Sequence, residues 1–316
     1  MTPRLLQRMG ASSRIGPRQT NQDSWHLNDR ALDGTALVAV LGVADGMGGL
    51  NAGDVASATA ISESVGAVDG QVIDGALMRE AVLRADFAVR NLPDEFAGAG
   101  TTLTLCAVVG NEAIIGHVGD TRVYLLRNGL LEQVTDDHSR VGELVRNGTI
   151  TEEEAMGHPE QNVLERALGA GGVPEVDIYR VALTPGDVLL LSTDGLHGVV
   201  PRPTLAEVLN STSSLQEACD SLTGLAEQWE SQDNITAVAW QFPAAPGSEE
   251  MIVRPVSSAS VTGQSRAGHS TQIRRGGVAP SEPLRSESVE WGSFVLSLVV
   301  VFASALLLGL GLGAVL

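Results

Sequence analysis

Four short β-prone runs follow one another between residues 101 and 134, and this succession constrains the fold more than any other feature of the sequence. They occupy residues 101–109, 113–118, 121–126 and 130–134, and the dipeptides Gly110-Asn111, Gly119-Asp120 and Asn128-Gly129 separate them. Asn-Gly between two apolar runs is a strong hairpin signal, because both residues tolerate positive φ. Such a meander favours an antiparallel sheet over a doubly wound parallel one.

Helical and strand-like segments flank the meander in blocks, which predicts a single α+β layered domain over residues 1–242. Strands are expected at 37–44, 176–183, 188–192 and 235–240. Helices are expected at 55–65 and at 77–92, the second with Asp74 as N-cap. A last helix is expected to open with a capping box, Ser214 to Glu217, and to bury an apolar face that runs to Trp229.

The C-terminal 25 residues differ from everything before them, because no charged residue occurs from Gly292 to Leu316. About 20 apolar residues span a bilayer core, so residues 291–316 are expected to form a transmembrane tail anchor, and a buried core helix is the alternative. Residues 243–290 form a linker rich in Pro, Ser, Gly and Arg. Its Arg274, Arg275 and Arg285 precede the span, so the positive-inside rule places the N-terminal domain in the cytoplasm, tethered to the plasma membrane by one pass.

Composition excludes several classes of protein. The formal net charge is -18 and every basic residue is arginine, which argues against nucleic-acid binding, since that requires a basic face. Cys106 and Cys219 lie far apart in apolar runs, giving neither a disulfide framework nor zinc spacing, so we expect core residues in a reducing compartment. The N-terminus lacks the apolar region of a signal peptide.

Four aspartates lie where strands meet loops, namely Asp23, Asp45, Asp194 and Asp233. Asp-Gly after a strand is usually only a turn, but a carboxylate held at the end of a buried strand is costly unless it is paired or binds a metal. If the four converge, a divalent cation would relieve their repulsion, and oxygen ligands suit Mg²⁺ or Mn²⁺. Arg18 could then bind a phosphate as a bidentate fork, which makes a metal-assisted phosphohydrolase plausible from the residues alone.

The ordered motifs of residues 10–242 resemble those of the metal-dependent protein phosphatases, the protein phosphatase 2C family. The matching segments are RQTNQDS (18–24), VADGMGG (43–49), GTTL (100–103), GHVGDTRVYLL (116–126), TDDHS (135–139), LLLSTDGL (189–196) and DNIT (233–236). Residues 142–169 resemble the flap segment of bacterial members. The resemblance implies four layers, with two antiparallel sheets face to face and helices on both outer sides, and a monomeric catalytic domain.

The resemblance also implies a role for each matching residue. Asp45 would bridge two Mn²⁺ or Mg²⁺ ions, and the Gly46 carbonyl would bind one of them. Asp194 and Asp233 would bind one ion and Asp23 would support the other, while Asp120 would belong to a third, weaker site. Arg18 would bind the substrate phosphate. The implied reaction is hydrolysis of phosphoserine and phosphothreonine in proteins by a metal-bridged hydroxide, opposing Ser/Thr kinases such as a membrane kinase.

Several positions depart from the family pattern. Gln22 replaces a frequent Glu, and Met47 and Leu50 stand where different members have His. Gly198 occupies the place of a second Asp after DGL. We expect His197 to be a surface loop residue and His138 to cap a loop. These departures keep open a pseudophosphatase that acts as a membrane-tethered phosphoprotein-binding module. A second alternative is a regulatory phosphatase that acts on an anti-sigma-factor antagonist; it differs from a phosphatase that opposes Ser/Thr kinases only in its substrate.

Overall fold

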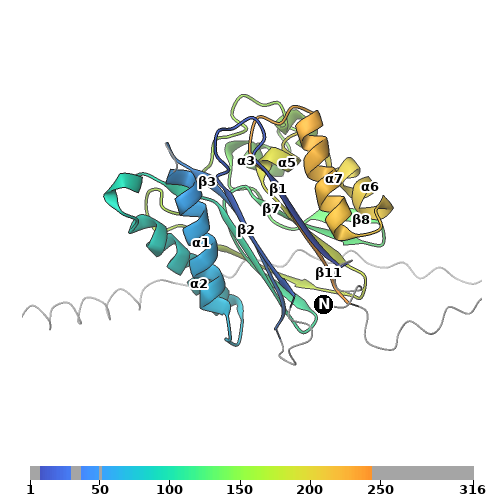
Figure 1. Cartoon of the computed structure of the whole chain (residues 1–316), viewed down its shortest axis with the longest axis horizontal. Coiled ribbons are helices and arrows are strands. Elements are labelled where there is room, and N and C mark those ends of the chain that lie inside the picture. Colours follow the sequence, from blue (N-terminus) through green and yellow to red (C-terminus); the bar gives the residue numbers. More distant parts are fainter. Residues whose placement is uncertain (1–7, 30–36, 50–51, 244–316) are drawn as a thin grey trace, which may run out of the picture. The chain divides into compact units, whose positions relative to one another are not determined.

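The computed structural model describes residues 8–29, 37–49 and 52–243 of the 316-residue chain. Two antiparallel sheets form its centre (Figure 1). One sheet has the order β1-β11-β10-β7-β8, and the other has the order β2-β3-β5-β6-β9 with β4 paired to β3. The first sheet is built from β1 (Met9–Arg14), β11 (Ile235–Gln241), β10 (Val188–Ser192), β7 (Arg122–Arg127) and β8 (Leu130–Gln133). The second is built from β2 (Asp23–Asp29), β3 (Leu37–Met47), β5 (Leu103–Val109), β6 (Glu112–Val118), β9 (Asp177–Ala182) and β4 (Gly100–Thr101).

Helices cover the outer face of each sheet. On one outer side, α1 (Ala52–Val68) and α2 (Gly75–Arg90) pack on the second sheet. On the other outer side, α6 (Arg202–Ser211) and α7 (Leu215–Gln228) pack on the first sheet (Figure 1). Another apolar cluster lies between the sheets and contains Leu41, Ile115, Leu191 and Trp240, all fully buried. The structure is therefore the predicted four-layer α+β sandwich. Short helices η1 (Asp94–Phe96), α3 (Arg140–Arg146), α4 (Glu152–Ala155) and α5 (Asp194–His197) complete it.

Local sequence explains the turns and helix starts. Asn128 and Gly129 both have positive φ, and Arg127 pairs with Leu130 across them, so the predicted two-residue hairpin is confirmed. The Asp74 side chain accepts from the Leu77 backbone N–H and caps α2, as expected. The buried residues of α2 recur every three or four positions (Met78, Ala81, Val82, Ala85 and Val89), which places one apolar face on the sheet.

Some local expectations were wrong. Ser214 caps α7, but Glu217 turns to the backbone and hydroxyl of Ser213, so the reciprocal half of the capping box is missing. Trp229 is 44% exposed because α7 ends at Gln228, before the residue that the apolar face was expected to include. β1 and α6 were not predicted as elements. Only Gly10 of β1 is buried, so MGASSR has no apolar alternation. The segment RPTLAEVLNS does carry a helical signal, since Leu205 and Leu209 are buried one turn apart, but this signal was missed.

The expected membrane anchor falls outside the part of the chain that the structure describes, as does the linker from residue 244 onward. Within residues 8–29, 37–49 and 52–243, none of the helices combines the length and apolar character needed to cross a bilayer. The division into a catalytic domain at 1–242, a linker and a C-terminal span stays a prediction.

Candidate active site

The two sheets bring four of the predicted aspartates to one end of the sandwich. Asp23 begins β2 and lies directly opposite Asp45, near the end of β3, in the antiparallel register. Asp194 follows β10 as the first residue of α5, and Asp233 precedes β11. Asp194 comes from the other sheet, yet its carboxyl and that of Asp45 lie close enough to affect each other's pKa. The predicted convergence of the strand-end carboxylates is therefore observed.

Two threonines hold the backbone around Asp45. The Asp45 N–H donates to Thr102 Oγ1 at 2.8 Å, and Thr101 Oγ1 donates to the Asp45 carbonyl at 2.9 Å. The Thr102 N–H also donates to that carbonyl at 2.9 Å, and Leu168, at the end of the flap segment, pairs with Thr101. These contacts explain the GTTL motif: its hydroxyls fix the strand end that carries Asp45 and join it to the flap segment.

Gly46 packs too closely for any side chain. A Cβ at this position would lie 2.0 Å from the Gly53 carbonyl oxygen and 2.7 Å from that of Gln22. The Gly46 N–H donates to the Gln22 carbonyl at 3.0 Å. A glycine is therefore required for β3 to pass between α1 and the coil segment that precedes β2, and the Gly46 backbone lies next to Asp45 in the chain.

Asp23 is buried and is held by hydroxyls from the opposite sheet. Its Oδ2 accepts from Thr193 Oγ1 at 2.8 Å and from Thr236 Oγ1 at 2.7 Å, while Oδ1 is buried without any hydrogen-bond partner. Burial, together with the charges of the neighbouring aspartates, outweighs these hydrogen bonds and raises the pKa of Asp23 to about 7. Neither threonine was predicted as a site residue, although Thr193 directly precedes Asp194 and Thr236 ends the DNIT motif that begins with Asp233.

The same causes act on the other carboxyls. Burial and the charges of Asp194 and Asp23 raise the pKa of Asp45 well above its ordinary value. Burial and the charge of Asp233 raise the pKa of Asp194 to about 6. Asp120, also buried, has its pKa raised by burial and then by the charge of Asp194. The shared upward direction shows that these carboxyls gather with too little positive charge to balance them.

Arg18 supplies positive charge at the rim of this cluster. Its Nη2 lies 2.7 Å from Asp233 Oδ2, and its Nε donates to the Gln232 carbonyl at 2.8 Å. The side chain is 49% exposed and lines a pocket that Asp120, Asp194 and Asp233 also line. The predicted phosphate-binding arginine thus stands at the mouth of the site, although its guanidinium is engaged by a carboxylate.

These residues fit divalent cations. Asp23 Oδ1 and Asp194 Oδ1 are buried oxygens without partners, and the donor set consists of carboxylate and carbonyl oxygens, which Mg²⁺ and Mn²⁺ prefer. Among the described residues, however, no three His, Cys, Asp or Glu side chains form a ready-made metal cage. Asp233 Oδ2 is paired with Arg18, so a cation that binds this oxygen must displace the arginine.

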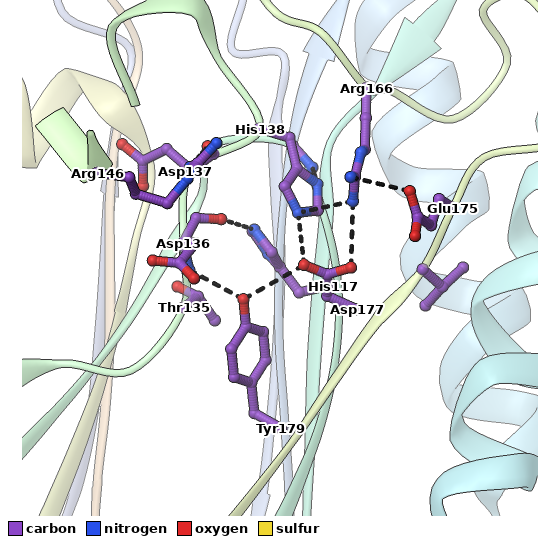
Figure 2. Close-up of polar contacts among 12 residues, drawn as sticks. His117, Thr135, Asp136, Asp137, His138, Arg146, Arg166, Glu175, Asp177 and Tyr179 are labelled. Atoms are coloured by element: carbon purple, nitrogen blue, oxygen red, sulfur yellow. Dashed lines mark hydrogen bonds and ion pairs between the residues drawn. The ribbon is translucent and has the colours of Figure 1, made fainter. Parts of the chain in front are cut away.

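The turn that carries Asp120 is fixed by a histidine. The Gly119 N–H donates to His138 Nδ1 at 3.2 Å, and the His138 N–H donates to the Gly119 carbonyl at 2.8 Å. Because Nδ1 accepts, the ring proton is on Nε2, which faces Asp177 Oδ2 at 3.1 Å (Figure 2). His138 therefore acts in the loop-capping role expected for it, and it also braces the Asp120 turn.

The network of Figure 2 continues from His138 into the flap segment. Arg166 Nη1 contacts Asp177 Oδ1 at 3.1 Å, and its Nη2 contacts Glu175 at 2.9 Å. Burial opposes ionisation of Asp177, but the hydrogen bond from His138 and the nearby positive charges lower its pKa to about 2. The ionised carboxylate joins the flap arginine to the histidine that holds the Asp120 turn.

The positions that depart from the family pattern have structural consequences. Gln22 Nε2 donates to the Gly48 carbonyl at 3.3 Å, and Met47 ends β3 at the site, whereas Leu50 lies outside the described residues. His197 is only 5% exposed, so the expectation of a surface loop residue was wrong. It ends α5, a helix that the sequence did not predict, and that helix turns the imidazole inward.

Comparisons with known proteins agree with this geometry. A model described as "Protein phosphatase 2C" matches residues 11–230. The serine/threonine phosphatase stp of Listeria monocytogenes is 40% identical over 210 residues, which cover 62% of this chain and 81% of that protein. The structure of the Mycobacterium tuberculosis serine/threonine phosphatase PstP/Ppp matches with a TM-score of 0.67 and 34% identity, covering 75% of this chain and 99% of that one. A catalytic domain of a PstP phosphatase in complex with two manganese ions matches with a TM-score of 0.66 and 32% identity, covering 75% and 98%.

Proposed function

The chain belongs to the protein phosphatase 2C family, and from that premise we propose how its carboxylate site removes phosphate from serine and threonine residues of proteins. The observation that carries the proposal is the meeting of Asp45 and Asp23 from one sheet with Asp194 and Asp233 from the other, with Arg18 at the rim. The enzyme is a metal-dependent protein serine/threonine phosphatase. Two ions, Mn²⁺ or Mg²⁺, are the proposed cofactors.

The proposed ligand set uses the oxygens that the fold has gathered. Asp45 would serve both ions, with the Gly46 carbonyl and Asp23 on one side and Asp194 and Asp233 on the other, and Asp120 would contribute to a third, weaker position. When bound, such ions lower the pKa of water and neutralise phosphate charge, which provides the nucleophile and the electrophilic activation for ester hydrolysis.

The chain's own residues provide orientation. Thr101 and Thr102 hold the Asp45 strand end, and Thr193 and Thr236 fix the Asp23 carboxylate. Arg18 is paired with Asp233 at the rim, and its planar guanidinium would bind two oxygens of the substrate phosphate when Asp233 instead serves as a metal ligand. No histidine occupies position 47, so protonation of the leaving serine or threonine oxygen falls to water rather than to a side chain there.

The activity is tested with the full-length chain and a phosphothreonine peptide in Mn²⁺, in Mg²⁺ and in excess EDTA, with the matching phosphotyrosine peptide as substrate control. We expect turnover of the phosphothreonine peptide that requires metal. A folded protein without turnover in either metal would overturn the proposed function and leave a phosphoprotein-binding module as the explanation.

We further propose that residues 291–316 anchor the enzyme in the plasma membrane by a single pass, with the catalytic domain in the cytoplasm. Support comes from the charge-free apolar run and from the arginines that precede it. The tether would concentrate the enzyme on phosphoproteins at the inner face, and so it would oppose a membrane Ser/Thr kinase. Carbonate-resistant membrane association of the full chain, lost on truncation after residue 242, is the expected result; equal solubility of both forms would contradict it.

A further inference from the structure

His138 joins three separate segments of the chain beside the active site. Its backbone N–H donates to the Gly119 carbonyl at 2.8 Å, and its backbone carbonyl accepts from the Glu165 N–H at 2.8 Å. Its ring Nδ1 accepts from the Gly119 N–H at 3.2 Å, and its ring Nε2 lies 3.1 Å from Asp177 Oδ2 (Figure 2). The imidazole is buried. The residue therefore connects the turn before Asp120, the flap segment and the start of β9.

The hydrogen positions in this network follow from groups that can only donate. The Gly119 N–H requires a lone pair on His138 Nδ1, so the ring is neutral and carries its hydrogen on Nε2. Arg166 Nη1 lies 3.3 Å from the same Nε2, but both nitrogens carry hydrogen and neither accepts. They donate instead to different oxygens of Asp177, Nε2 to Oδ2 and Nη1 to Oδ1, each at 3.1 Å. Asp177 thus accepts from both donors, which requires both of its oxygens.

A second buried histidine holds the other side of the same turn. His117 Nε2 donates to the Asp136 carbonyl at 3.0 Å, and burial lowers the pKa of His117 to about 4, so its Nδ1 is an acceptor at neutral pH. The Thr104 hydroxyl donates to this Nδ1 at 2.8 Å, and the Thr121 hydroxyl, 2.7 Å from Thr104 Oγ1, donates to Thr104 in turn. The residues before and after Asp120 are therefore each held through a neutral imidazole.

The tautomer of His138 depends on the Asp177 carboxylate. Glu175, 2.9 Å from Arg166 Nη2, keeps the guanidinium beside the ring. Without a carboxylate at position 177, Arg166 and the ring N–H would face each other as two donors. The ring would relieve this conflict by moving its hydrogen to Nδ1, where it would oppose the Gly119 N–H. The hydrogen bond that holds the turn before Asp120 would then be lost.

We propose that Asp177 is a positioning residue of the phosphatase, which holds the turn carrying Asp120 by keeping His138 in the tautomer that accepts from Gly119. The inference rests on the proposed function, in which Asp120 contributes to metal binding. Asp177 is not among the described residues that line the active-site pocket, so it acts through His138 rather than by touching the substrate. Its loss should lower kcat more than it changes KM, because Arg18, the proposed phosphate ligand, is not altered.

The tautomer is measured directly by nitrogen NMR of the full-length wild-type protein with isotope-labelled histidine, at neutral pH in EDTA. The chain has six histidines, and His138→Gln identifies the signals of residue 138. We expect hydrogen on Nε2 and a bare Nδ1. The opposite tautomer, or a doubly protonated ring, would overturn the inference without any variant at position 177.

The consequence for the turn is measured by hydrogen exchange of the Gly119 amide, resolved to single residues by mass spectrometry in EDTA, which is independent of metal and of catalysis. Asp177→Asn keeps the size of the side chain but offers one acceptor oxygen instead of two. Gly119 should exchange about fivefold faster or more, as expected for the loss of one hydrogen bond. In Mn²⁺, kcat for a phosphothreonine peptide should fall about tenfold, as for other outer-shell changes, with KM within about twofold of the wild-type value.

A second substitution tests the competition between the two donors. Arg166→Met removes the guanidinium, so the single amide oxygen of Asp177→Asn can accept from His138 alone. The double variant should therefore recover slow Gly119 exchange and most of the lost kcat. The matched control is Asp187→Asn, which removes a carboxylate that accepts from Arg127 at 2.6 Å in the turn between β9 and β10. It should lower the unfolding temperature and leave Gly119 exchange and kcat unchanged.

Thermal unfolding in EDTA identifies any variant that is misfolded. Unchanged Gly119 exchange or unchanged kcat in a folded Asp177→Asn, or no recovery in the double variant, would overturn the inference. Gly119 exchange that behaves as expected in a protein whose wild type hydrolyses no phosphopeptide would refute the proposed function alone.

Discussion

The metal-free enzyme should lose stability as pH rises, because Asp23 holds its proton more tightly in the folded state than in the unfolded chain. Its pKa is raised from 3.8 to about 7, chiefly by burial. Between these two values the folded protein binds more protons at Asp23, so the contribution of this group to the free energy of unfolding falls with increasing pH and is lost above pH 7. The raised pKa values of Asp45 and Asp194 act in the same direction. The repulsion that causes this loss is the same repulsion that a bound cation would relieve.

The size of the effect follows from the shift. A difference of one pKa unit corresponds to about 1.4 kcal/mol, so titration of Asp23 between pH 4.5 and 7.5 is expected to lower the unfolding free energy by about 3 kcal/mol. For a domain of this size, that corresponds to roughly 10 °C in the unfolding midpoint. Buried His117, with its pKa lowered to about 4, and His197 act in the opposite direction below pH 6.5, so the wild-type profile alone does not isolate Asp23.

The comparison variant is Asp23→Asn. The amide oxygen can still accept from Thr193 and Thr236, and the amide nitrogen takes the place of the unpartnered Oδ1. Thermal unfolding of both full-length proteins in EDTA at pH 4.5 and 7.5 should show the wild type losing about 3 kcal/mol relative to the variant. Mn²⁺ at pH 7.5 should restore the wild type more than the variant. Parallel pH profiles would refute the assignment of Asp23 as a buried, repelled carboxylate.

Three further predictions follow from individual contacts. Arg18→Ala should raise KM for a phosphopeptide by about tenfold or more, since a hydrogen bond to a charged group contributes about 1.5–3 kcal/mol. The control is Arg84→Ala, an exposed arginine on α2, which should leave KM unchanged. Equal KM values for the wild type and Arg18→Ala would show that Arg18 does not bind the phosphate. Thr102→Val should lower the free energy of unfolding, measured in urea, by about 1–3 kcal/mol and should weaken Mn²⁺ binding, because it leaves the buried N–H of Asp45 without its acceptor. Unchanged metal affinity would argue against that positioning role. Burial raises the pKa of both Cys106 and Cys219 to about 12. Neither thiol should therefore react with a disulfide reagent in the native protein, and both should react after unfolding in guanidinium. Rapid labelling of the native protein would contradict their burial.

Local patterns were sufficient for the layered fold. Turn dipeptides such as Asn128-Gly129 set hairpins through the backbone conformations of two adjacent residues, and the Asp74 cap acts within one helical turn. The strand-end positions of Asp45 and Asp194 could be predicted for the same reason. Turns, helix caps and strand ends depend on residues close together in the sequence, so the sequence pattern was sufficient to predict them.

The support of the site could not be predicted in that way, because it depends on contacts between distant segments. Asp23 receives hydroxyls from residues 170 and 213 positions away, and the orientation of those hydroxyls follows from the packing of the two sheets. The burial of His197 was missed for a related reason, since only the unpredicted turn of α5 directs its ring inward. The motifs TDG (193–195) and DNIT (233–236) identified Asp194 and Asp233 as site residues, but the three-dimensional fold was required to assign the contacts of Thr193 and Thr236.

The most direct test of the account is the rate of phosphothreonine-peptide hydrolysis by the full-length enzyme and by Asp45→Asn, measured side by side in Mn²⁺ and in EDTA. The account predicts that EDTA abolishes wild-type turnover. It also predicts that Asp45→Asn is slower by on the order of a thousandfold, since the variant lacks the charge that both cations would share. The variant should nevertheless be folded, and at neutral pH it should be at least as stable as the metal-free wild type, because a repelled buried carboxylate has been removed. Hydrolysis that survives EDTA, or an Asp45→Asn enzyme that retains the wild-type rate, would contradict the claim that the converging carboxylates act by holding metal.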